Sequence, residues 1–467
     1  SSHIYLKQMN RKCESALENG AEPVRVLSSV LGQNYPSDEL EYSWKKLMQN
    51  HPHDSICCCS VDEVQDEMAT RFNKSKQVAD YLVSEGKRYI ADKINTKEYE
   101  KYKNALPFVV FNTTGRERTS VVSVEIDVTR KSGWLKKCAY DLDEINVPNY
   151  KLIDSDGNSI PFKIEDLGVK FGYDLPKDKF RQPYMARRVR VTFEAENISA
   201  VGYKTYALVE GDTEKVTDTL VSSENCMEND AIRVEINKNG SLNVTDKASG
   251  RTYKGVAYYE ETGDLGNEYM YKMPEGSKAI TTQDTVAKIE LAEDEPYRAM
   301  YKITNTITVP KSGDDNFEDE KSHMVFFKER VGGRSNDTVE MKIETFVSLD
   351  KNGKGVKIKT RFDNEVKDHR VRIMVPTGIN SDVHKADSVF EVVTRNNRHN
   401  AGWNNPSACE HEQGFVSIDD GEKGIAVANI GLYEYEMIIQ SQLQFFVQSV
   451  KWAIGACSRL LRLNAWV

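Results

Sequence analysis

The residues Asn50 to Asp54 read Asn-His-Pro-His-Asp, which places two imidazoles and a carboxylate close together in the chain. Pro52 fixes its own φ angle and disfavours helical backbone at the residue before it. We therefore expect a short, rigid link that presents His51, His53 and Asp54 from one point. Neutral imidazole nitrogens and a carboxylate oxygen suit Zn²⁺, and a carboxylate can also hydrogen-bond a sugar hydroxyl.

A helix end without any chemistry explains the same residues. A histidine near a helix C-terminus interacts favourably with the helix dipole, and Asp54 could cap the helix that follows. Three metal ligands are rarely so close together unless other parts of the fold contribute. On residue chemistry alone both interpretations stay open, with the helix end slightly ahead.

The run Cys57-Cys58-Cys59 offers a third interpretation, a zinc site built from thiolates and histidines. Structural zinc sites usually separate their cysteines by about two to four residues and use two such elements, and this chain has no second one. We expect small buried thiols here instead. The eight cysteines of the 467-residue chain follow no regular spacing, which predicts reduced thiols.

Helical periodicity runs from residue 3 to about residue 103. In its first part, apolar residues recur at helical spacing up to the pair Asn19-Gly20, which predicts a helix stop. A second helix is expected to end at Gly32.

Two further helices are expected on either side of residues 50–60, a segment called the histidine link below. The first begins after Ser37 or Asp38 and ends by Asn50. The second follows Ser60, which together with Glu63 has the pattern of a capping box. The apolar faces of these helices predict a bundle.

The period changes at Leu106, and from there β-rich runs alternate with turn signals such as Asn239-Gly240. This pattern is typical of antiparallel β-sandwiches. The polar stretch 211–229 predicts a boundary between a smaller and a larger β domain, and the polar stretch 311–321 predicts a surface loop. The expected domains are a helical domain (1–103), a small β-sandwich (104–215) and a large β-sandwich (216–467).

The formal net charge of -9 and a pI near 5.6 argue against a nucleic-acid partner, which normally requires a basic surface. The sequence has no stretch of about 20 apolar residues and no signal-peptide pattern at its start, so we expect a cytoplasmic protein with no membrane partner. The chain starts at Ser1 without Met, which leaves room for an upstream part and a leader.

The stretch Asn-His-Pro-His-Asp-Ser-Ile-Cys-x-Cys-Ser-x-Asp-Glu-Val, from Asn50 to Val64, closely resembles the histidine-aspartate motif of the bacterial family 38 glycoside hydrolases, the retaining α-mannosidases. In that family the motif lies in a three-helix middle domain. Further stretches support the resemblance: Ile4–Gln8, Ala21–Pro23, Asp246–Gly250, Gly263–Tyr269, His369–Arg372, Gly421–Val427 and Glu434–Glu436.

By this resemblance His53 is a zinc ligand and Asp54 contacts the mannose hydroxyls. Tyr269 and Asp264, in an acidic and aromatic loop, become candidate substrate contacts. The resemblance implies one Zn²⁺ whose other ligands lie outside this chain. It also places the nucleophile and the acid/base carboxylate in an α/β domain before residue 1, so we expect no catalytic residue in this chain. Cys58 stands where this branch typically has glycine, and Gln65 where it often has histidine.

We therefore expect an α + β multidomain chain, a three-helix-type bundle followed by antiparallel β-sandwiches, that is inactive alone and serves α-mannoside hydrolysis in a complete enzyme. Its substrate would be an α-mannoside oligosaccharide or a mannosyl conjugate. The pattern after Met437 departs from the family, so we expect the large domain to be truncated at its C-terminal end and to associate, as a homodimer. The alternative is a non-catalytic carbohydrate-binding or scaffold fragment.

Arg370 and Arg372 alternate along a predicted strand and therefore share a face. For this pair we favour structural salt bridges over a role in the site.

Overall fold

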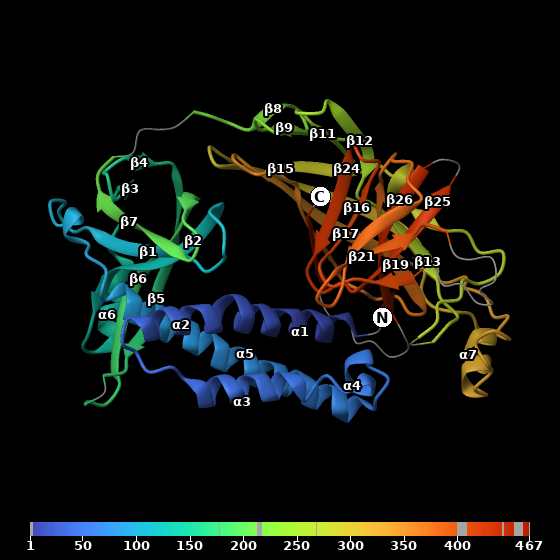
Figure 1. Cartoon of the computed structure of the whole chain (residues 1–467), viewed down its shortest axis with the longest axis horizontal. Coiled ribbons are helices and arrows are strands. Elements are labelled where there is room, and N and C mark those ends of the chain that lie inside the picture. Colours follow the sequence, from blue (N-terminus) through green and yellow to red (C-terminus); the bar gives the residue numbers. More distant parts are fainter. Residues whose placement is uncertain are drawn as a thin grey trace.

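The computed structural model describes residues 3–176, 178–212, 217–267, 269–398, 409–440, 443–452 and 461–466. The helical region lies along one side of the molecule, and a small and a large β region stand side by side above it (Figure 1). This arrangement confirms the expected α + β fold class, helices first and antiparallel sheets after them. Among the described residues, no helix is both long enough and apolar enough to cross a membrane.

The helical region is a bundle of three long rods and one short helix. Its elements are α1 (Ile4–Ala16), a π-helical turn η1 (Leu17–Ala21), α2 (Glu22–Val30), α3 (Ser37–Met48), α4 (His53–Cys57) and α5 (Asp62–Ala91), followed by a 3₁₀ turn η2 (Lys97–Tyr99). The buried residues of α5 recur every three or four positions, which directs one stripe of the helix toward the other rods. They are Gln65, Met68, Phe72, Ser75, Ala79, Leu82, Gly86 and Ile90.

The expected helix stop at Asn19-Gly20 is wrong, because α1, η1 and α2 follow one another without a break. A Cβ atom at Gly20 would lie 3.1 Å from Cγ2 of Val83 on α5. The glycine therefore allows a close helix approach rather than ending the helix. The stop at Gly32 is confirmed, since α2 ends at Val30 and Gly32 has a φ of +97°, which favours glycine.

The expected capping box is also wrong. Helix α5 begins at Asp62, its N-cap is Val61, and no side chain caps it. Gln65 instead donates from Nε2 to the Ser60 carbonyl oxygen at 2.9 Å and to the Cys58 carbonyl oxygen at 3.3 Å. Gln65 thus fastens the histidine link to α5. Helix α3, expected to begin after Ser37 or Asp38, begins at Ser37 itself, with Pro36 as its N-cap.

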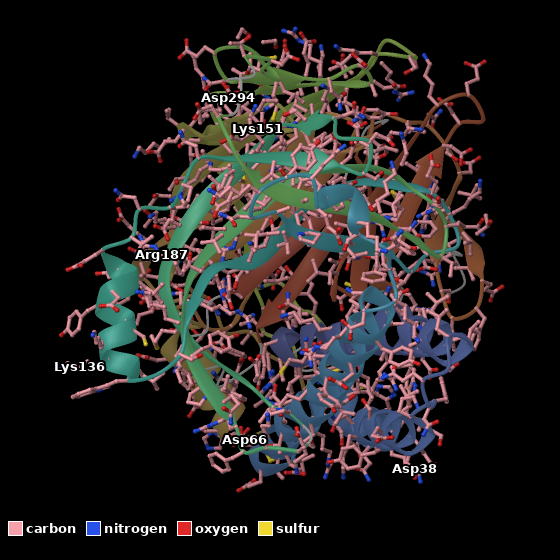
Figure 2. The ribbon with its side chains drawn as sticks, turned by 90° about the vertical axis from the view of Figure 1, so that its left-hand side faces the viewer. Asp38, Asp66, Lys136, Lys151, Arg187 and Asp294 are labelled. Carbon is pink, nitrogen blue, oxygen red and sulfur yellow. The ribbon has the colours of Figure 1, made fainter. Side chains whose placement is uncertain are left out.

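The small β region contains two sheets, ordered β1-β7-β3-β4 and β2-β6-β5. Its helix α6 (Leu135–Asp143), which the sequence did not predict, packs beside β6, where Nη1 of Arg187 lies 3.3 Å from Oδ1 of Asp143. Lys136 of α6 points away from the sheets (Figure 2). The strands are β1 (Leu106–Asn112), β2 (Arg118–Lys131), β3 (Tyr150–Asp154), β4 (Ser159–Ile160), β5 (Phe162–Asp174), β6 (Gln182–Ile198) and β7 (Gly202–Glu210).

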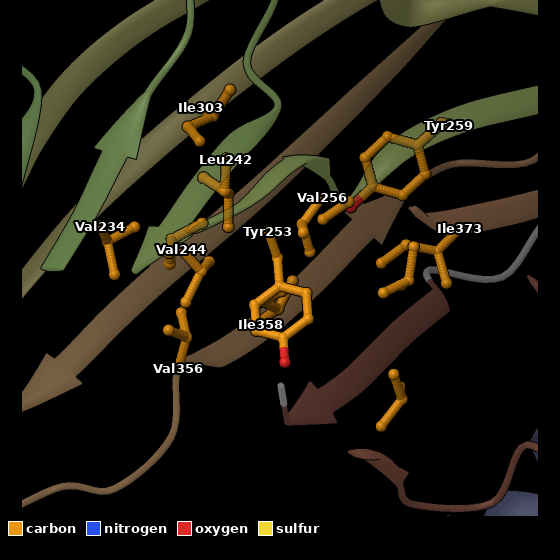
Figure 3. Packing of buried hydrophobic residues seen from close by; sticks show 14 of the residues in the cluster. Val234, Leu242, Val244, Tyr253, Val256, Tyr259, Ile303, Val356, Ile358 and Ile373 are labelled. Carbon is orange, nitrogen blue, oxygen red and sulfur yellow. The ribbon is translucent and has the colours of Figure 1, made fainter. Parts of the chain in front are cut away.

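The large β region contains three sheets, ordered β12-β11-β10-β9-β8, β14-β13-β19-β26-β25-β22 and β15-β16-β17-β18-β27-β24-β23-β20-β21. Its core is built from alternating apolar residues of all three sheets (Figure 3). The first half of its elements are β8 (Val221–Ser223), β9 (Cys226–Glu228), β10 (Ile232–Ile236), β11 (Leu242–Asp246), β12 (Arg251–Val256), β13 (Tyr258–Gly263), β14 (Ile280–Thr281), η3 (Thr282–Asp284), β15 (Lys288–Glu295), β16 (Arg298–Pro310) and α7 (Asp315–Ser322).

The remaining strands are β17 (Thr338–Asp350), β18 (Lys357–Phe362), β19 (His369–Pro376), β20 (Val383–Asp387), β21 (Val392–Asn396), β22 (Cys409–His411), β23 (Phe415–Asp419), β24 (Gly424–Asn429), β25 (Glu434–Gln440), β26 (Leu443–Trp452) and β27 (Leu461–Trp466). The stretch 311–321, expected as a loop, contains the start of helix α7 instead. Asp314 caps this helix by accepting a hydrogen bond from the Phe317 amide at 2.8 Å, a pattern that the sequence interpretation missed.

The three regions contact one another directly. Ile4 of α1 belongs to the apolar core of the large β region. Thr113 of the small region donates from Oγ1 to the carbonyl oxygen of Asn19 at 2.6 Å. Asn352 of the large region donates from Nδ2 to Oε2 of Glu194 in the small region at 2.9 Å. The bundle is therefore held against both β regions.

Candidate functional site

The histidine link joins α3 to α5 and contains α4, which lies at the end of the bundle that faces the large β region (Figure 1). Pro52 has a φ of -49° and a ψ of 139°, so it is extended and serves as the N-cap residue of α4. The chain leaves α4 at Cys58, whose φ of +64° is left-handed. A rigid proline start and a left-handed end fix the orientation of the one-turn helix between them.

His53 and Asp54 open α4 and face solvent. Nε2 of His53 lies 3.3 Å from Oδ1 of Asp54, and the two side chains are 91% and 64% exposed. Both groups are therefore accessible to a metal ion or a sugar hydroxyl. Their roles as zinc ligand and mannose contact stay predictions.

His51 differs from His53 because helix α1 holds it. Its Nε2 donates to Oδ1 of Asn10 at 2.8 Å, and Asn10 in turn donates from Nδ2 to Oε1 of Glu14 at 2.7 Å. Burial lowers the pKa of His51, while the Glu14 charge opposes that shift. His51 is thus oriented by the bundle, and its Nε2 is already engaged.

The three adjacent cysteines have three different environments. Cys58 is buried, and Nζ of the buried Lys7 lies 3.0 Å from its Sγ. Cys59 donates from its thiol to Oδ1 of Asp54 at 3.5 Å, whereas Cys57 is exposed. The expectation of buried thiols is therefore correct only for Cys58.

Every cysteine in the described part of the chain is a free thiol, in agreement with the predicted reduced state. Cys457 lies outside the described residues. Within the described ranges, no group of three or more His, Cys, Asp or Glu side chains is placed to hold a metal ion. The link therefore offers part of a ligand set and does not form a thiolate zinc site with the described residues.

A loop from the large β region reaches this link. It leaves β13 at Gly263 and carries Tyr269, whose side chain lies beside Cys59. The interaction with Cys59 is the largest cause that raises the pKa of Tyr269 to about 12, with further contributions from burial and from the charges of Cys59, Asp54 and Cys57. Tyr269 and Asp54, predicted separately as substrate contacts, are thus brought to one surface.

Local sequence shapes the loop. Oδ1 of Asn267 accepts hydrogen bonds from the amides of Tyr269 at 3.0 Å and Met270 at 2.8 Å, which forms a tight turn. A Cβ atom at Gly266 would lie 1.7 Å from the carbonyl oxygen of Met270, so only glycine fits there. Both features place Tyr269 at the tip of the loop.

Asp264 closes the base of the same loop. It is buried, and its Oδ1 accepts hydrogen bonds from the amides of Gly266 at 2.8 Å and Lys272 at 3.1 Å. The structure therefore gives Asp264 a role in shaping the loop, and its predicted substrate contact is not tested by these bonds.

The two arginines of β19 form buried salt bridges, as predicted. Nη1 of Arg370 lies 2.9 Å from Oε1 of Glu436, and Arg372 pairs with both Glu260 and Glu436. Cζ of Arg370 also lies 3.5 Å from the ring centroid of Tyr271, which supports the loop from the sheet side.

A cavity of about 330 Å³ lies elsewhere, at the contact of the small and large β regions. Asp154, Glu194, Tyr206 and Tyr297 are among its lining residues, and no residue of the histidine link takes part. Its volume alone does not connect it with the predicted chemistry.

Three regions of the chain match family models. Residues 1–90 match the alpha mannosidase middle domain. Residues 103–210 match the glycosyl hydrolases family 38 C-terminal domain 1, and residues 227–447 match the glycosyl hydrolases family 38 C-terminal domain.

A curated protein of Halalkalibacterium halodurans, named "Putative mannosylglycerate hydrolase", is 37% identical to this chain over 464 residues. The alignment covers 96% of this chain and 51% of that protein. The chain therefore spans about half the length of this curated relative.

Two solved structures from Enterococcus faecalis share the fold. An alpha-mannosidase from strain V583 is 36% identical with a TM-score of 0.95, and the match covers 100% of this chain and 54% of that one. A protein in glycosyl hydrolase family 38 is 35% identical with a TM-score of 0.92, covering 100% of this chain and 56% of that one. With a middle-domain match and two C-terminal-domain matches in the same order, this chain belongs to glycoside hydrolase family 38.

Proposed function

We propose that this chain supplies one wall of the active site of a zinc-dependent, retaining α-mannosidase. The observation that carries this proposal is the meeting of Asp54 from the histidine link and Tyr269 from the large β region beside the exposed His53. The relatives are named as an alpha-mannosidase and a mannosylglycerate hydrolase, which supports an α-mannoside or a mannosyl conjugate as the substrate.

The donor chemistry of the link fits a zinc ion. His53 offers an exposed imidazole, and its ring has no partner except Asp54 among the described residues. Among the described residues no group of three or more His, Cys, Asp or Glu side chains is placed to hold a metal ion, and in our proposal the other ligands come from outside this chain. When bound, the metal would polarise sugar hydroxyls and help to stabilise developing charge.

The residues of this chain bind and orient the sugar in our proposal. The Asp54 carboxylate accepts hydrogen bonds from the mannose hydroxyls, and Tyr269, whose pKa is raised to about 12, offers its hydroxyl as a further contact. A retaining glycosidase also needs a nucleophile and an acid/base carboxylate about 5 Å apart. We place both outside this chain. The homodimer and the cytoplasmic location stay predictions.

A fusion protein tests the proposal. The part of the Enterococcus faecalis alpha-mannosidase that this chain does not cover is joined to the chain, and hydrolysis of an aryl α-mannoside is measured. We expect the fusion to be active, a chelator to lower that activity, and the chain alone to be inactive. Asp54→Asn should lower kcat/KM by about 10- to 100-fold, the range for one charged hydrogen bond.

Two results contradict the proposal. Turnover by the chain alone would show that its catalytic groups lie within it. A fusion that folds and binds mannose without hydrolysing it would favour the carbohydrate-binding alternative.

A further inference from the structure

We infer that Arg330 is a positioning residue that holds one loop of the large β region against Asp54 and Cys59. This loop, residues 264–267 and 269–273, is called the Tyr269 loop below. This inference rests on the proposed function for its meaning, because it explains how one wall of the site keeps its shape. The supporting contacts lie in the segment from Val325 to Arg334, which follows α7 and has no feature that the sequence interpretation selected.

Arg330 joins two segments through backbone oxygens. Its Nη1 donates to the carbonyl oxygens of Leu265 at 2.8 Å and Gly266 at 2.6 Å, both in the Tyr269 loop. Its Nε donates to the carbonyl oxygen of Val325 at 3.0 Å in its own segment. The planar guanidinium has a fixed fork of donors, so these three bonds set the position of the loop relative to the segment.

Lys272 makes the reciprocal connection from the other end of the loop. Its Nζ donates to the carbonyl oxygens of Lys328 at 2.8 Å and Arg330 at 2.6 Å. The loop is therefore held at Leu265 and Gly266 on one side of Tyr269 and at Lys272 on the other.

The supporting segment is itself firmly held. The buried Glu320 of α7 accepts hydrogen bonds from the amides of Val331 at 2.7 Å and Gly332 at 3.2 Å. Cζ of Arg330 also lies 5.6 Å from the ring centroid of Phe317, which is buried in the same helix. Helix α7 thus provides a rigid base from which Arg330 can act on the loop.

Cysteine alkylation separates local positioning from general stability. The Tyr269 side chain lies beside the Cys59 thiol, so the alkylation rate of Cys59 reports whether the loop is in place. Cys13 and Cys226 are only 1% and 2% exposed, so their alkylation reports global opening in the same sample.

The experiment uses brief exposure of the whole chain to iodoacetamide, followed by mass spectrometry, in a Cys57→Ser background that simplifies assignment. Arg330→Ala and Tyr269→Ala should each speed the alkylation of Cys59 by roughly fivefold, the factor that corresponds to losing one polar interaction of ordinary strength. Arg330→Lys should fall between, because an ammonium can reach fewer of the carbonyl oxygens. Lys328→Ala is the matched control, since this residue is exposed and accepts the Lys272 hydrogen bond through its main-chain oxygen, which the substitution keeps.

In the Tyr269→Ala background, Arg330→Ala should add no further increase at Cys59, and Cys13 and Cys226 should be unchanged throughout. An unchanged Cys59 rate in Arg330→Ala would overturn the inference, as would a parallel rise at Cys13 and Cys226 or an unchanged rate in Tyr269→Ala. The alkylation measurement needs neither metal nor sugar. It can therefore support this inference when the mannosidase proposal fails, and contradict this inference when the mannosidase proposal holds.

Discussion

Nζ of Lys7 lies 3.0 Å from Sγ of Cys58, and both side chains are almost completely buried. The contact ties helix α1 to the C-cap residue of α4, the helix that His53 and Asp54 open. Cys58 also has a left-handed backbone, which is unfavourable for a residue with a Cβ atom. The family resemblance implies glycine at this position. Here a cysteine adopts the left-handed conformation instead, and its thiol contacts Lys7.

This relationship predicts different effects for two substitutions of Cys58. Cys58→Ala removes the thiol and keeps the unfavourable backbone, whereas Cys58→Gly removes both. The glycine variant should therefore be more stable than the alanine variant by about 1 kcal/mol, as measured by urea unfolding. Cys57→Ala is the control at an exposed neighbouring site, with an expected change within about 0.5 kcal/mol. An alanine variant as stable as the glycine variant would contradict this account.

The two histidines of the link should differ in metal binding. In the active fusion, His53→Ala should lose bound zinc, as measured by metal analysis after dialysis. His51→Ala should keep the metal, because Nε2 of His51 is already bonded to Asn10. The Cys57→Ser/Cys59→Ser double variant should also keep it. Zinc retained in His53→Ala and lost in the cysteine variant would point to a thiolate site instead.

Acid should destabilise the large β region through Glu436. Burial alone would raise the pKa of Glu436, but the charges of Arg370 and Arg372 outweigh it and hold the pKa below its ordinary value. The unfolded chain therefore binds the proton more readily, so this stabilisation is complete above about pH 4.5 and is lost as pH falls through the folded pKa.

Glu436→Gln tests this pH dependence by thermal unfolding between about pH 3 and pH 7. The variant should show a shallower loss of Tm on the acid side. At neutral pH it should be less stable by about 3–5 kcal/mol, because two buried arginines lose a shared partner. If the Tm of the variant falls with decreasing pH as steeply as the Tm of the unchanged chain, other carboxylates control acid unfolding.

Gly86 of α5 should resist replacement by alanine. A Cβ atom there would lie 2.6 Å from Cγ1 of Val24 on α2. Alanine favours a helix by about 1 kcal/mol over glycine, but overpacking costs about 1–3 kcal/mol, so Gly86→Ala should be neutral to destabilising. Adding Val24→Ala to Gly86→Ala should cost less than Val24→Ala alone, a coupling that denaturant unfolding can measure. Purely additive effects would argue against the close helix contact.

The sequence alone determined the features that depend on neighbouring residues. Pro52 predicted an extended break between two helices, and the apolar stripe of α5 and the change of period at Leu106 predicted the order of helices and strands. The alternation of Arg370 and Arg372 predicted that one face of a strand would carry both charges, and Glu436 lies there. The resemblance of the Asn50–Val64 stretch led to the family that the comparisons show.

Only the tertiary structure decided the rest. Gly20 has the local signature of a helix stop, yet the approach of α5 makes it a packing residue. Tyr269 and Cys59 lie in different domains, and their contact depends on how the bundle docks against the large β region and on the bonds of Arg330 and Lys272 to backbone oxygens. Local periodicity carries no information about such bonds, because a carbonyl oxygen is present at every residue and only the fold selects which ones meet a cation.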